Sequence, residues 1–359
     1  MRIFYRVLRI VLYSFFSLFT PKKNIILIQY DKNDSYGNIS ILYEKMKGAP
    51  DVYKICGTSQ NIIEEVKNIY LVAGSRVIAV DTSSPYVSQI QHSSKTDIIF
   101  IGHGGGAYKK MAFAALSPDA SRKERQRVQR VHGKYTYVIS SSSSICHQVS
   151  YNYNIDISHV KSLGLPRTDV FYNTDFSKYK EIFLIENPSI SGKKLILYAP
   201  TFRTQKKCRH APLFIDESVF PKNFYDEFCI LFRKHPTAPE ISFPSSWIDV
   251  SNYSLLKCLT ITDFLISDFS SIIFDFSFFH KPIFLLIPDL KQYIKKERTL
   301  WFLPSEIAPG MCCRTTEDII EKLKNPRRSD LWEKYMDKCD GSSSERIINF
   351  IFQLKNMEH

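Results

Sequence analysis

Residues 263–276, with the sequence DFLISDFSSIIFDF, decide the fold of the chain. They predict an apolar strand at 264–267, a short polar turn and then an apolar helix. Ser270 and Ser271 lie at the predicted helix start, where their hydroxyls, the backbone N–H groups and the helix dipole can bind a phosphate. Asp275 follows Ser271 by one helical turn, so its carboxylate can face the same ligand and accept from a sugar hydroxyl. The alternative is an ordinary helix cap followed by a surface aspartate.

The same alternation of β-rich runs and amphipathic stretches extends in both directions from this segment. Toward the N-terminus, buried strands are predicted at 24–30, 52–56, 76–80, 97–101, 135–140 and 158–163, with helical patterns such as 62–69 between them. A second series is predicted at 195–198, 228–232, 264–267 and 283–287. Such alternation indicates parallel sheets covered by helices on both faces. We therefore expect an α/β protein with two Rossmann-like domains that face each other across a cleft, at the carboxyl ends of both sets of strands.

The predicted domain boundaries follow from these two series. They divide the chain into an N-terminal segment, two Rossmann-like domains and a C-terminal group of helices, at residues 1–23, 24–175, 176–325 and 326–359. The polar stretch 169–193 lacks a strong strand signal and is interpreted as the linker region. Helices are expected at 317–324 and 344–355, and a run of serines can cap the second of them.

Composition restricts the class of protein. The chain has 359 residues, of which 44% are hydrophobic and 23% are charged, and this excludes disorder, collagen-like repeats and a disulfide-rich scaffold. Its 48 Lys and Arg residues against 36 Asp and Glu leave a net charge of +12, which predicts an anionic partner such as nucleic acid, a phosphorylated substrate or a membrane surface. The 8 cysteines form no CxxC motif, so we expect reduced thiols in a cytoplasmic protein.

The N-terminal segment 1–23 combines basic residues with an apolar, aromatic-rich run and contains no acid. The uncharged run after Arg9 stops at Pro21, well short of the roughly 20 apolar residues that a spanning helix needs. Arg9 interrupts the apolar stretch and no small-residue cleavage pattern precedes Pro21, so a signal peptide is not indicated. The segment predicts a helix that lies in the interface of an anionic membrane, with its arginines on lipid headgroups. The alternative is an ordinary first helix packed on the body of the protein.

A histidine and three glycines follow the strand predicted at 97–101. Gly104, Gly105 and Gly106 let the backbone approach a ligand without obstruction by side chains. His103 is thereby placed at the carboxyl end of a strand, where ligands bind in α/β proteins, and this position favours a general base. Neither a Walker loop nor a GxGxxG spacing is present. The alternative is a structural histidine.

Three potential cations end the strand predicted at 228–232. Arg233, Lys234 and His235 precede Pro236, which forces the chain to turn there. Three cations at one strand end can stabilise the negative charge that develops on the leaving group when a diphosphate is cleaved. The alternative is a solvated turn.

Six segments that follow one another in order carry a resemblance to a known family. They are HG at 103–104, GLPRTD at 164–169, YAPTFR at 198–203, RKHP at 233–236, SDFSSIIFD at 267–275 and IAPG at 307–310. From about residue 97 to residue 352, the chain resembles the CDP-glycerol glycerophosphotransferase family, the primases and polymerases of teichoic acid and related capsule assembly. The ordered set makes the resemblance specific, although each motif alone is weak.

The resemblance implies a GT-B fold, with the acceptor at the first Rossmann-like domain and the nucleotide held mainly by the second. It implies a reaction in which an acceptor hydroxyl attacks the polyol-bearing phosphorus of CDP-glycerol and CMP leaves. It further implies that His103 is the base and that His235 lines the CDP-glycerol site. Because His235 lies beside Arg233 and Lys234, we expect it to stabilise charge on the departing CMP. The residues that the resemblance places around the substrates are Gly104, Gly105, Gly106, Ala107, Arg167, Pro200, Thr201, Arg233, Lys234, Ser270, Ser271 and Asp275.

The sequence departs from the family pattern directly after Gly104. The family usually continues with Thr or Ser and then Pro, whereas Gly105, Gly106 and Ala107 follow here. The expected donor is therefore CDP-glycerol, CDP-ribitol or another CDP-polyol.

Together these observations predict a peripheral enzyme at the cytoplasmic face of the cell membrane that moves a polyol phosphate onto a lipid-linked or cell-surface glycan. The alternative enzyme is a GT-B glycosyltransferase with a nucleotide-sugar donor, because both chemistries need the same diphosphate site. A nucleic-acid-binding protein would explain the net charge but not the motifs at strand ends, and no interleaving of aromatic and basic residues of the RRM type is present. No cofactor is expected. The sequence contains no carboxylate cluster of the kind that binds a metal, so no metal is predicted.

Overall fold

The chain forms two compact units, which are described separately. The computed structural model describes residues 2–30, 36–102, 104–203, 213–235, 238 and 241–357. Unit 1 comprises Met1–Asn173 and Tyr335–His359, and unit 2 comprises Thr174–Lys334. The last helix therefore belongs to unit 1, whereas the sequence analysis placed it in a group of its own.

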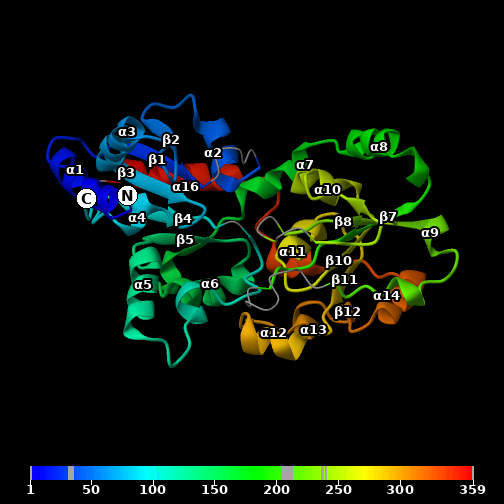
Figure 1. The fold of residues 1–359 in the computed structure, drawn as a ribbon. Coiled ribbons are helices and arrows are strands. Elements are labelled where there is room, and N and C mark those ends of the chain that lie inside the picture. Colours follow the sequence, from blue (N-terminus) through cyan, green and yellow to red (C-terminus); the bar gives the residue numbers. More distant parts are fainter. Residues whose placement is uncertain are drawn as a thin grey trace. The chain divides into compact units, whose positions relative to one another are not determined.

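The described part of unit 1 contains a six-stranded parallel sheet with helices packed against it (Figure 1). The strand order is β2-β1-β3-β4-β5-β6. The strands are β1 (Asn24–Gln29), β2 (Val52–Cys56), β3 (Ser75–Val80), β4 (Asp97–Phe100), β5 (Tyr137–Ser140) and β6 (Val160–Ser162). The helices are α1 (Arg2–Phe16), α2 (Asn38–Met46), α3 (Ile62–Ala73), α4 (Pro85–Ser88), α5 (Arg122–His132), α6 (Cys146–Tyr153), α7 (Val170–Asn173) and α16 (Ser343–Asn356).

All six strands predicted for the N-terminal half are present, with ends that differ by no more than one or two residues. The central strands β1 and β3 are buried along their whole length, as expected for apolar runs covered on both faces. The prediction that 52–56 is a buried strand is wrong, because Tyr53 and Lys54 of β2 are exposed. The physical reason is position, since β2 lies at the edge of the sheet and, among the strands that the structure describes, pairs only with β1.

Helix α1 is held on unit 1 by polar contacts beneath it. The guanidinium of Arg9 pairs with the carboxylate of Glu65 at 2.5 Å and donates to the Gln89 side chain at 3.0 Å. Arg9 is only 7% exposed and Glu65 is fully buried. The expectation that the arginines of this segment lie on lipid headgroups is therefore wrong for Arg9. No helix in the described ranges is long and apolar enough to cross a membrane.

The described part of unit 2 also contains a six-stranded parallel sheet. Its order, β9-β8-β7-β10-β11-β12, is the 3-2-1-4-5-6 order of a Rossmann fold. The strands are β7 (Lys194–Tyr198), β8 (Phe228–Phe232), β9 (Ile248–Asp249), β10 (Phe264–Ser267), β11 (Ile283–Leu286) and β12 (Cys312–Cys313). The helices are α8 (Ser177–Glu186), α9 (Phe224–Glu227), α10 (Leu255–Ile261), α11 (Ile272–Ser277), α12 (Leu290–Lys296), α13 (Pro304–Ile307), α14 (Thr316–Lys324) and α15 (Leu331–Tyr335), which ends where the chain returns to unit 1.

Two expectations about chain connections differ from the structure. The predicted linker region 169–193 contains helix α8, which packs on α10 and buries Phe183 completely. The serines before α16 do not cap it with their side chains. Instead, the buried carboxylate of Asp169 accepts from the backbone N–H groups of Ser343 at 3.0 Å and Ser344 at 2.7 Å. Asp169 of the GLPRTD motif therefore supplies the negative charge that a helix N-terminus favours.

Candidate active site

The predicted donor residues of unit 2 follow the carboxyl ends of three adjacent strands. Pro200 and Thr201 follow β7, the 233–235 segment follows β8, and Ser270 and Ser271 follow β10. These strands lie side by side in the order β8-β7-β10. Neighbouring strands of a sheet are about 4.8 Å apart, so the structure brings these residues to one edge of the sheet.

A buried ion cluster fixes this edge. The guanidinium of Arg203 pairs with Asp268 at 2.9 Å and with Asp289 at 3.1 Å. Burial alone would lower the pKa of Arg203, but the two carboxylates outweigh it and hold that pKa above its usual value. The guanidinium also lies over the ring of Tyr293, 4.7 Å from its centroid, and that ring stacks on Phe269. The cluster thus joins the ends of β7, β10 and β11 through one arginine.

Thr201 is held by the same cluster. The carboxylate of Asp268 accepts from the Thr201 backbone N–H at 2.9 Å and from its hydroxyl at 2.5 Å. Arg203 donates to the Thr201 carbonyl oxygen at 2.6 Å. The backbone of Thr201 is therefore fixed from both sides, and its hydroxyl points to Asp268.

The start of α11 differs in detail from the prediction. Ser270 and Ser271 are partly exposed. The Ser270 hydroxyl oxygen accepts from the backbone N–H of Ile272 at 3.3 Å. That backbone N–H, one of the groups predicted to donate to a phosphate, therefore already has a partner. Asp275 is 1% exposed. A surface aspartate, the alternative weighed from the sequence, is thus not what the structure contains.

The segment after β8 has a structural role that the sequence did not suggest. Nη1 of Arg233 donates to the carbonyl oxygens of Val250 at 3.0 Å and Tyr253 at 2.6 Å. This nitrogen therefore holds the loop after β9 and is not available to a phosphate. The Lys234 backbone N–H donates to Ser251 Oγ at 3.0 Å. His235 is exposed, and its ring stacks on Phe202 with centroids 6.3 Å apart.

The glycine loop of unit 1 packs tightly against the protein itself. His103 lies outside the described residues, and Gly104 follows it. A Cβ on Gly105 would lie 2.2 Å from the Met336 sulfur, and the Gly106 N–H donates to Ser141 Oγ at 3.1 Å. Gly106 has a φ of 77° and Ala107 a φ of 43°, so both adopt the left-handed conformation. A side chain at position 105 would therefore need Met336 to shift, so close packing inside unit 1 is one reason for the glycine there.

A buried asparagine connects this loop to Arg167. Asn38 is 1% exposed, and its Nδ2 donates to the carbonyl oxygen of Gly102 at 2.8 Å. Its Oδ1 accepts from the backbone N–H of Arg167 at 2.9 Å. One side chain therefore holds both the residue that precedes His103 and the backbone of Arg167.

Comparison with known proteins identifies the family. The family model described as CDP-glycerol:poly(glycerophosphate) glycerophosphotransferase matches residues 11–353. The chain belongs to this glycerophosphotransferase family. The resemblance carried by the six ordered motifs is thus confirmed.

Individual relatives of this glycerophosphotransferase agree with the assignment. This chain is 30% identical over 353 residues to the teichoic acid glycerol-phosphate primase of Bacillus subtilis (strain 168), and the match covers 94% of this chain and 90% of that protein. It is 25% identical over 367 residues to the teichoic acid ribitol-phosphate primase of Bacillus spizizenii, covering 94% of each. A solved structure of a histidine-to-asparagine variant of the wall teichoic acid polymerase TagF, soaked with CDPG, matches with a TM-score of 0.71 at 21% identity, covering 96% of this chain and 93% of that one. The predicted α/β fold of the GT-B type is confirmed by this likeness.

Sequence reasoning missed three residues that organise the candidate site. Arg203 and Asp268 lie within quoted motifs, and a usable signal existed, because charged residues at the ends of apolar strands must pair if they are buried. Asn38 gave no signal, since its partners at 102 and 167 are distant in the sequence. Among the residues that the structure describes, no three His, Cys, Asp or Glu side chains are grouped so that they could hold a metal ion.

Proposed function

We propose that this chain transfers glycerol phosphate, or another polyol phosphate, from a CDP-activated donor to a hydroxyl of a lipid-linked or cell-surface glycan. The acceptor oxygen forms a bond to the polyol-bearing phosphorus, the bond from that phosphorus to the CMP oxygen breaks, and the hydroxyl proton passes to His103. The observation that carries this proposal is the family match over residues 11–353. Such a reaction depends on positioning and on charge stabilisation rather than on covalent chemistry by the protein.

The strand ends of unit 2 supply the groups that the donor needs. In this proposal the hydroxyls of Ser270 and Ser271 donate to the diphosphate, and Lys234 and His235 stabilise negative charge on the departing CMP. Thr201, fixed by Asp268, presents its backbone at the same edge. In unit 1, the loop of Gly104 to Ala107 and the nearby Arg167 contact the polyol phosphate.

The products of the reaction distinguish this function from its rival. Purified protein is incubated with CDP-glycerol, CDP-ribitol or nucleotide sugars and a lipid-linked disaccharide, and the products are weighed by mass spectrometry. Release of CMP with a new phosphodiester supports the proposal. Release of a nucleoside diphosphate with a new glycoside would establish the glycosyltransferase instead.

Replacement of Ser270 and Ser271 by alanine should weaken donor binding. Two hydroxyl donors are lost while backbone N–H groups remain, so the loss should be about 1 to 3 kcal/mol in total. Calorimetric titration with CDP-glycerol measures it. The matched control is Ser191→Ala with Ser218→Ala, two exposed serines of unit 2. Unchanged affinity in a folded Ser270/Ser271 variant would move the phosphate site elsewhere.

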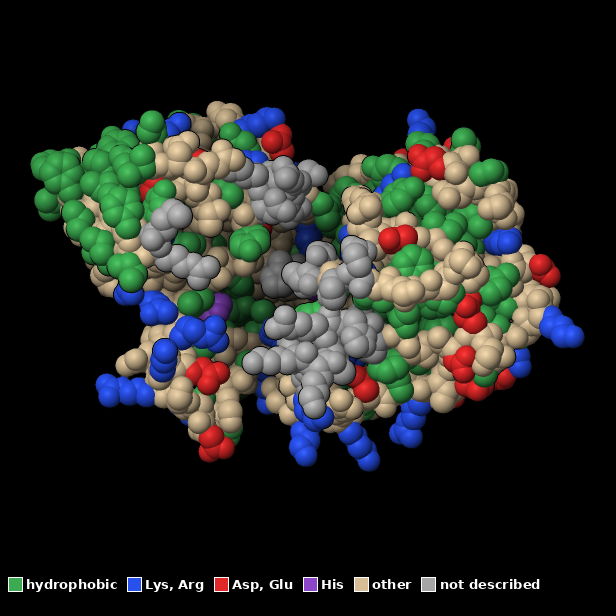
Figure 2. All heavy atoms as spheres, in the orientation of Figure 1, with side chains coloured by type: hydrophobic (Ala, Val, Ile, Leu, Met, Phe, Trp, Pro, Cys, Tyr) green, Lys and Arg blue, Asp and Glu red, His purple; other side chains and the backbone are tan. Residues whose placement is uncertain are grey.

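We also propose that α1 attaches the enzyme to the cytoplasmic face of the membrane. Hydrophobic side chains gather over α1 and the turn after it (Figure 2). They are 42% to 80% exposed and comprise Ile3, Phe4, Val7, Ile10, Val11, Phe15, Leu18 and Phe19. An exposed apolar group of this kind is typical of a helix that lies in a bilayer interface. Because Arg9 is buried, the charge for anionic headgroups comes from exposed residues of the same segment such as Arg6 and Lys23.

Substitution of Val7 and Val11 by aspartate should release the enzyme from membranes. Both are more than half exposed, so the fold tolerates the change, whereas a carboxylate in the acyl region of an anionic bilayer is strongly disfavoured. Co-sedimentation with phosphatidylglycerol vesicles should fall more than about 10-fold, and salt should weaken binding of the unaltered chain. The control is Ile182→Asp with Ile185→Asp on α8. Equal sedimentation of the α1 variant and wild type would contradict the attachment.

A further inference from the structure

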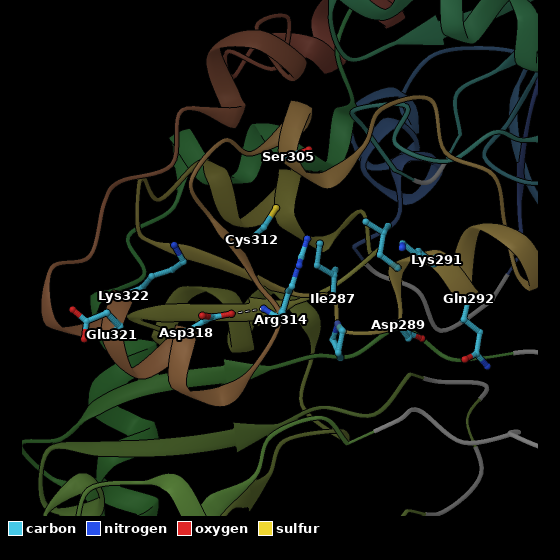
Figure 3. Close-up of a pocket in the computed structure, with 12 residues that line it drawn as sticks. Ile287, Asp289, Lys291, Gln292, Ser305, Cys312, Arg314, Asp318, Glu321 and Lys322 are labelled. Atoms are coloured by element: carbon cyan, nitrogen blue, oxygen red, sulfur yellow. Dashed lines mark hydrogen bonds between the residues drawn. The ribbon is translucent and has the colours of Figure 1, made fainter.

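An open pocket of about 710 Å³ lies in unit 2 beside the proposed donor site. It is formed after the carboxyl ends of β11 and β12, by the loop that leads into α12, by Ser305 of α13 and by one face of α14 (Figure 3). Its size is that of a pocket for a ligand of many atoms, not of a site for a single ion. Ser270, Ser271, Thr201 and His235 do not line it.

Three cationic side chains reach this pocket from three different elements. Lys291 comes from α12, Arg314 follows β12, and Lys322 comes from α14. The side chains of Lys291 and Arg314 have no hydrogen-bond or ion-pair partner among the described residues, and Lys322 donates to the carbonyl oxygen of Gly310 at 2.8 Å. Lys291 and Arg314 are exposed. Their positive charge is therefore available to a ligand.

The carboxylates of the pocket, in contrast, already have partners. Asp289 is paired with Arg203 at 3.1 Å, and Glu321 is paired with Lys324 at 2.6 Å. Asp318 accepts from the backbone N–H groups of Arg314 at 2.7 Å and Thr315 at 3.2 Å, at the start of α14. Two of these three acids are paired with cations other than Lys291, Arg314 and Lys322, and Asp318 is held by backbone N–H groups. The three cations of the pocket therefore favour an anion that accepts hydrogen bonds from lysine and arginine, as a phosphate does.

The position of the pocket separates it from the donor nucleotide. The donor residues follow β7, β8 and β10, whereas the pocket follows β11 and β12, which continue the sheet beyond β10. The Arg203 cluster lies between the two groups, because Arg203 binds Asp268 on the donor side and Asp289 on the pocket side. A ligand in the pocket therefore has its own set of cations.

We propose that this pocket binds a phosphodiester-bearing segment of the polyol phosphate chain, as acceptor or product. The inference rests on the proposed function, since that reaction makes phosphodiesters of this class. The same phosphate chemistry could come from the donor's diphosphate, and the experiment distinguishes the two sources.

The test removes the three cations and measures binding, not turnover. The variant is Lys291→Gln, Arg314→Gln and Lys322→Gln in the full chain. The matched control is Lys194→Gln, Lys222→Gln and Arg328→Gln, which removes the same charge from exposed positions of unit 2 outside this pocket. The probes are a synthetic tetra(glycerol phosphate) and CDP-glycerol, each titrated calorimetrically at two salt concentrations.

The pocket variant should bind tetra(glycerol phosphate) at least about 10-fold more weakly than wild type, with a smaller dependence on salt, while CDP-glycerol binds as before. The control variant should lose much less affinity for tetra(glycerol phosphate). Loss of CDP-glycerol affinity would assign the pocket to the donor. No binding of the tetramer by wild type, or equal losses in variant and control, would overturn the proposal. CMP release by wild type tests the proposed function separately, so the two failures are distinguishable.

Discussion

Replacement of Arg203 by alanine should lower the free energy of unfolding of unit 2 by about 3 to 5 kcal/mol. Arg203 is 5% exposed and Asp268 is 2% exposed, so removal of the guanidinium leaves a buried carboxylate without its counter-ion. Asp289 and the Thr201 carbonyl oxygen lose a donor in the same step. Removal of one partner from a buried ion cluster is costly because the remaining charge is neither paired nor hydrated.

Tryptophan fluorescence during urea unfolding measures this loss in the full chain. All 3 tryptophans, at 247, 301 and 332, lie within unit 2, so their emission follows that unit. The matched control is Lys180→Ala, which breaks the partly exposed pair with Asp263 and should cost less than about 1 kcal/mol. Arg203→Lys should recover only part of the loss, because an ammonium cannot present the planar fork that contacts two carboxylates. A loss for Arg203→Ala no larger than that for Lys180→Ala would show that the cluster does not hold the strand ends.

The sheets were predictable because burial of parallel strands leaves a direct trace in the sequence. Apolar runs such as those of β1, β8 and β10 are covered on both faces, and their ends were predicted to within a residue or two. Strands β9 and β12 were missed because each has two residues, too few to form a hydrophobic pattern. Helix α8 was missed because its apolar residues do not gather on one face, and Phe183 is its one buried side chain.

The candidate site was predictable in place but not in detail. A parallel sheet brings the carboxyl ends of its strands to one edge, and this rule grouped Thr201, Ser270 and His235 without any coordinates. Which polar atom contacts which partner depends on segments far apart in the chain. Asp169 caps α16 across more than 170 residues, and Arg233 binds the loop after β9. Asn38 was missed for the same reason.

Replacement of His103 and replacement of His235 should have different effects on turnover and on donor affinity. His103→Ala should lower the single-turnover rate by about 10² to 10⁴ while the dissociation constant of CDP-glycerol stays nearly unchanged. The reason is its proposed task, since a base that takes the proton of the attacking hydroxyl is needed only in the transition state. His103 follows Gly102 in unit 1, and the carbonyl oxygen of Gly102 accepts a hydrogen bond from Asn38. The proposed base therefore belongs to unit 1.

His235→Ala should instead lower turnover and donor affinity together. Its exposed ring follows Arg233 and Lys234 at the carboxyl end of β8, so it can donate to a phosphate oxygen both in the bound donor and in the departing CMP. Donor dissociation constants and single-turnover rates are measured for both variants, with circular dichroism as the check on folding. His147→Ala, which replaces an exposed histidine on α6 outside the proposed site, is the matched control and should change neither quantity. If His103→Ala abolishes donor binding, His103 is a phosphate ligand, and if it keeps near-normal turnover, it is not the base.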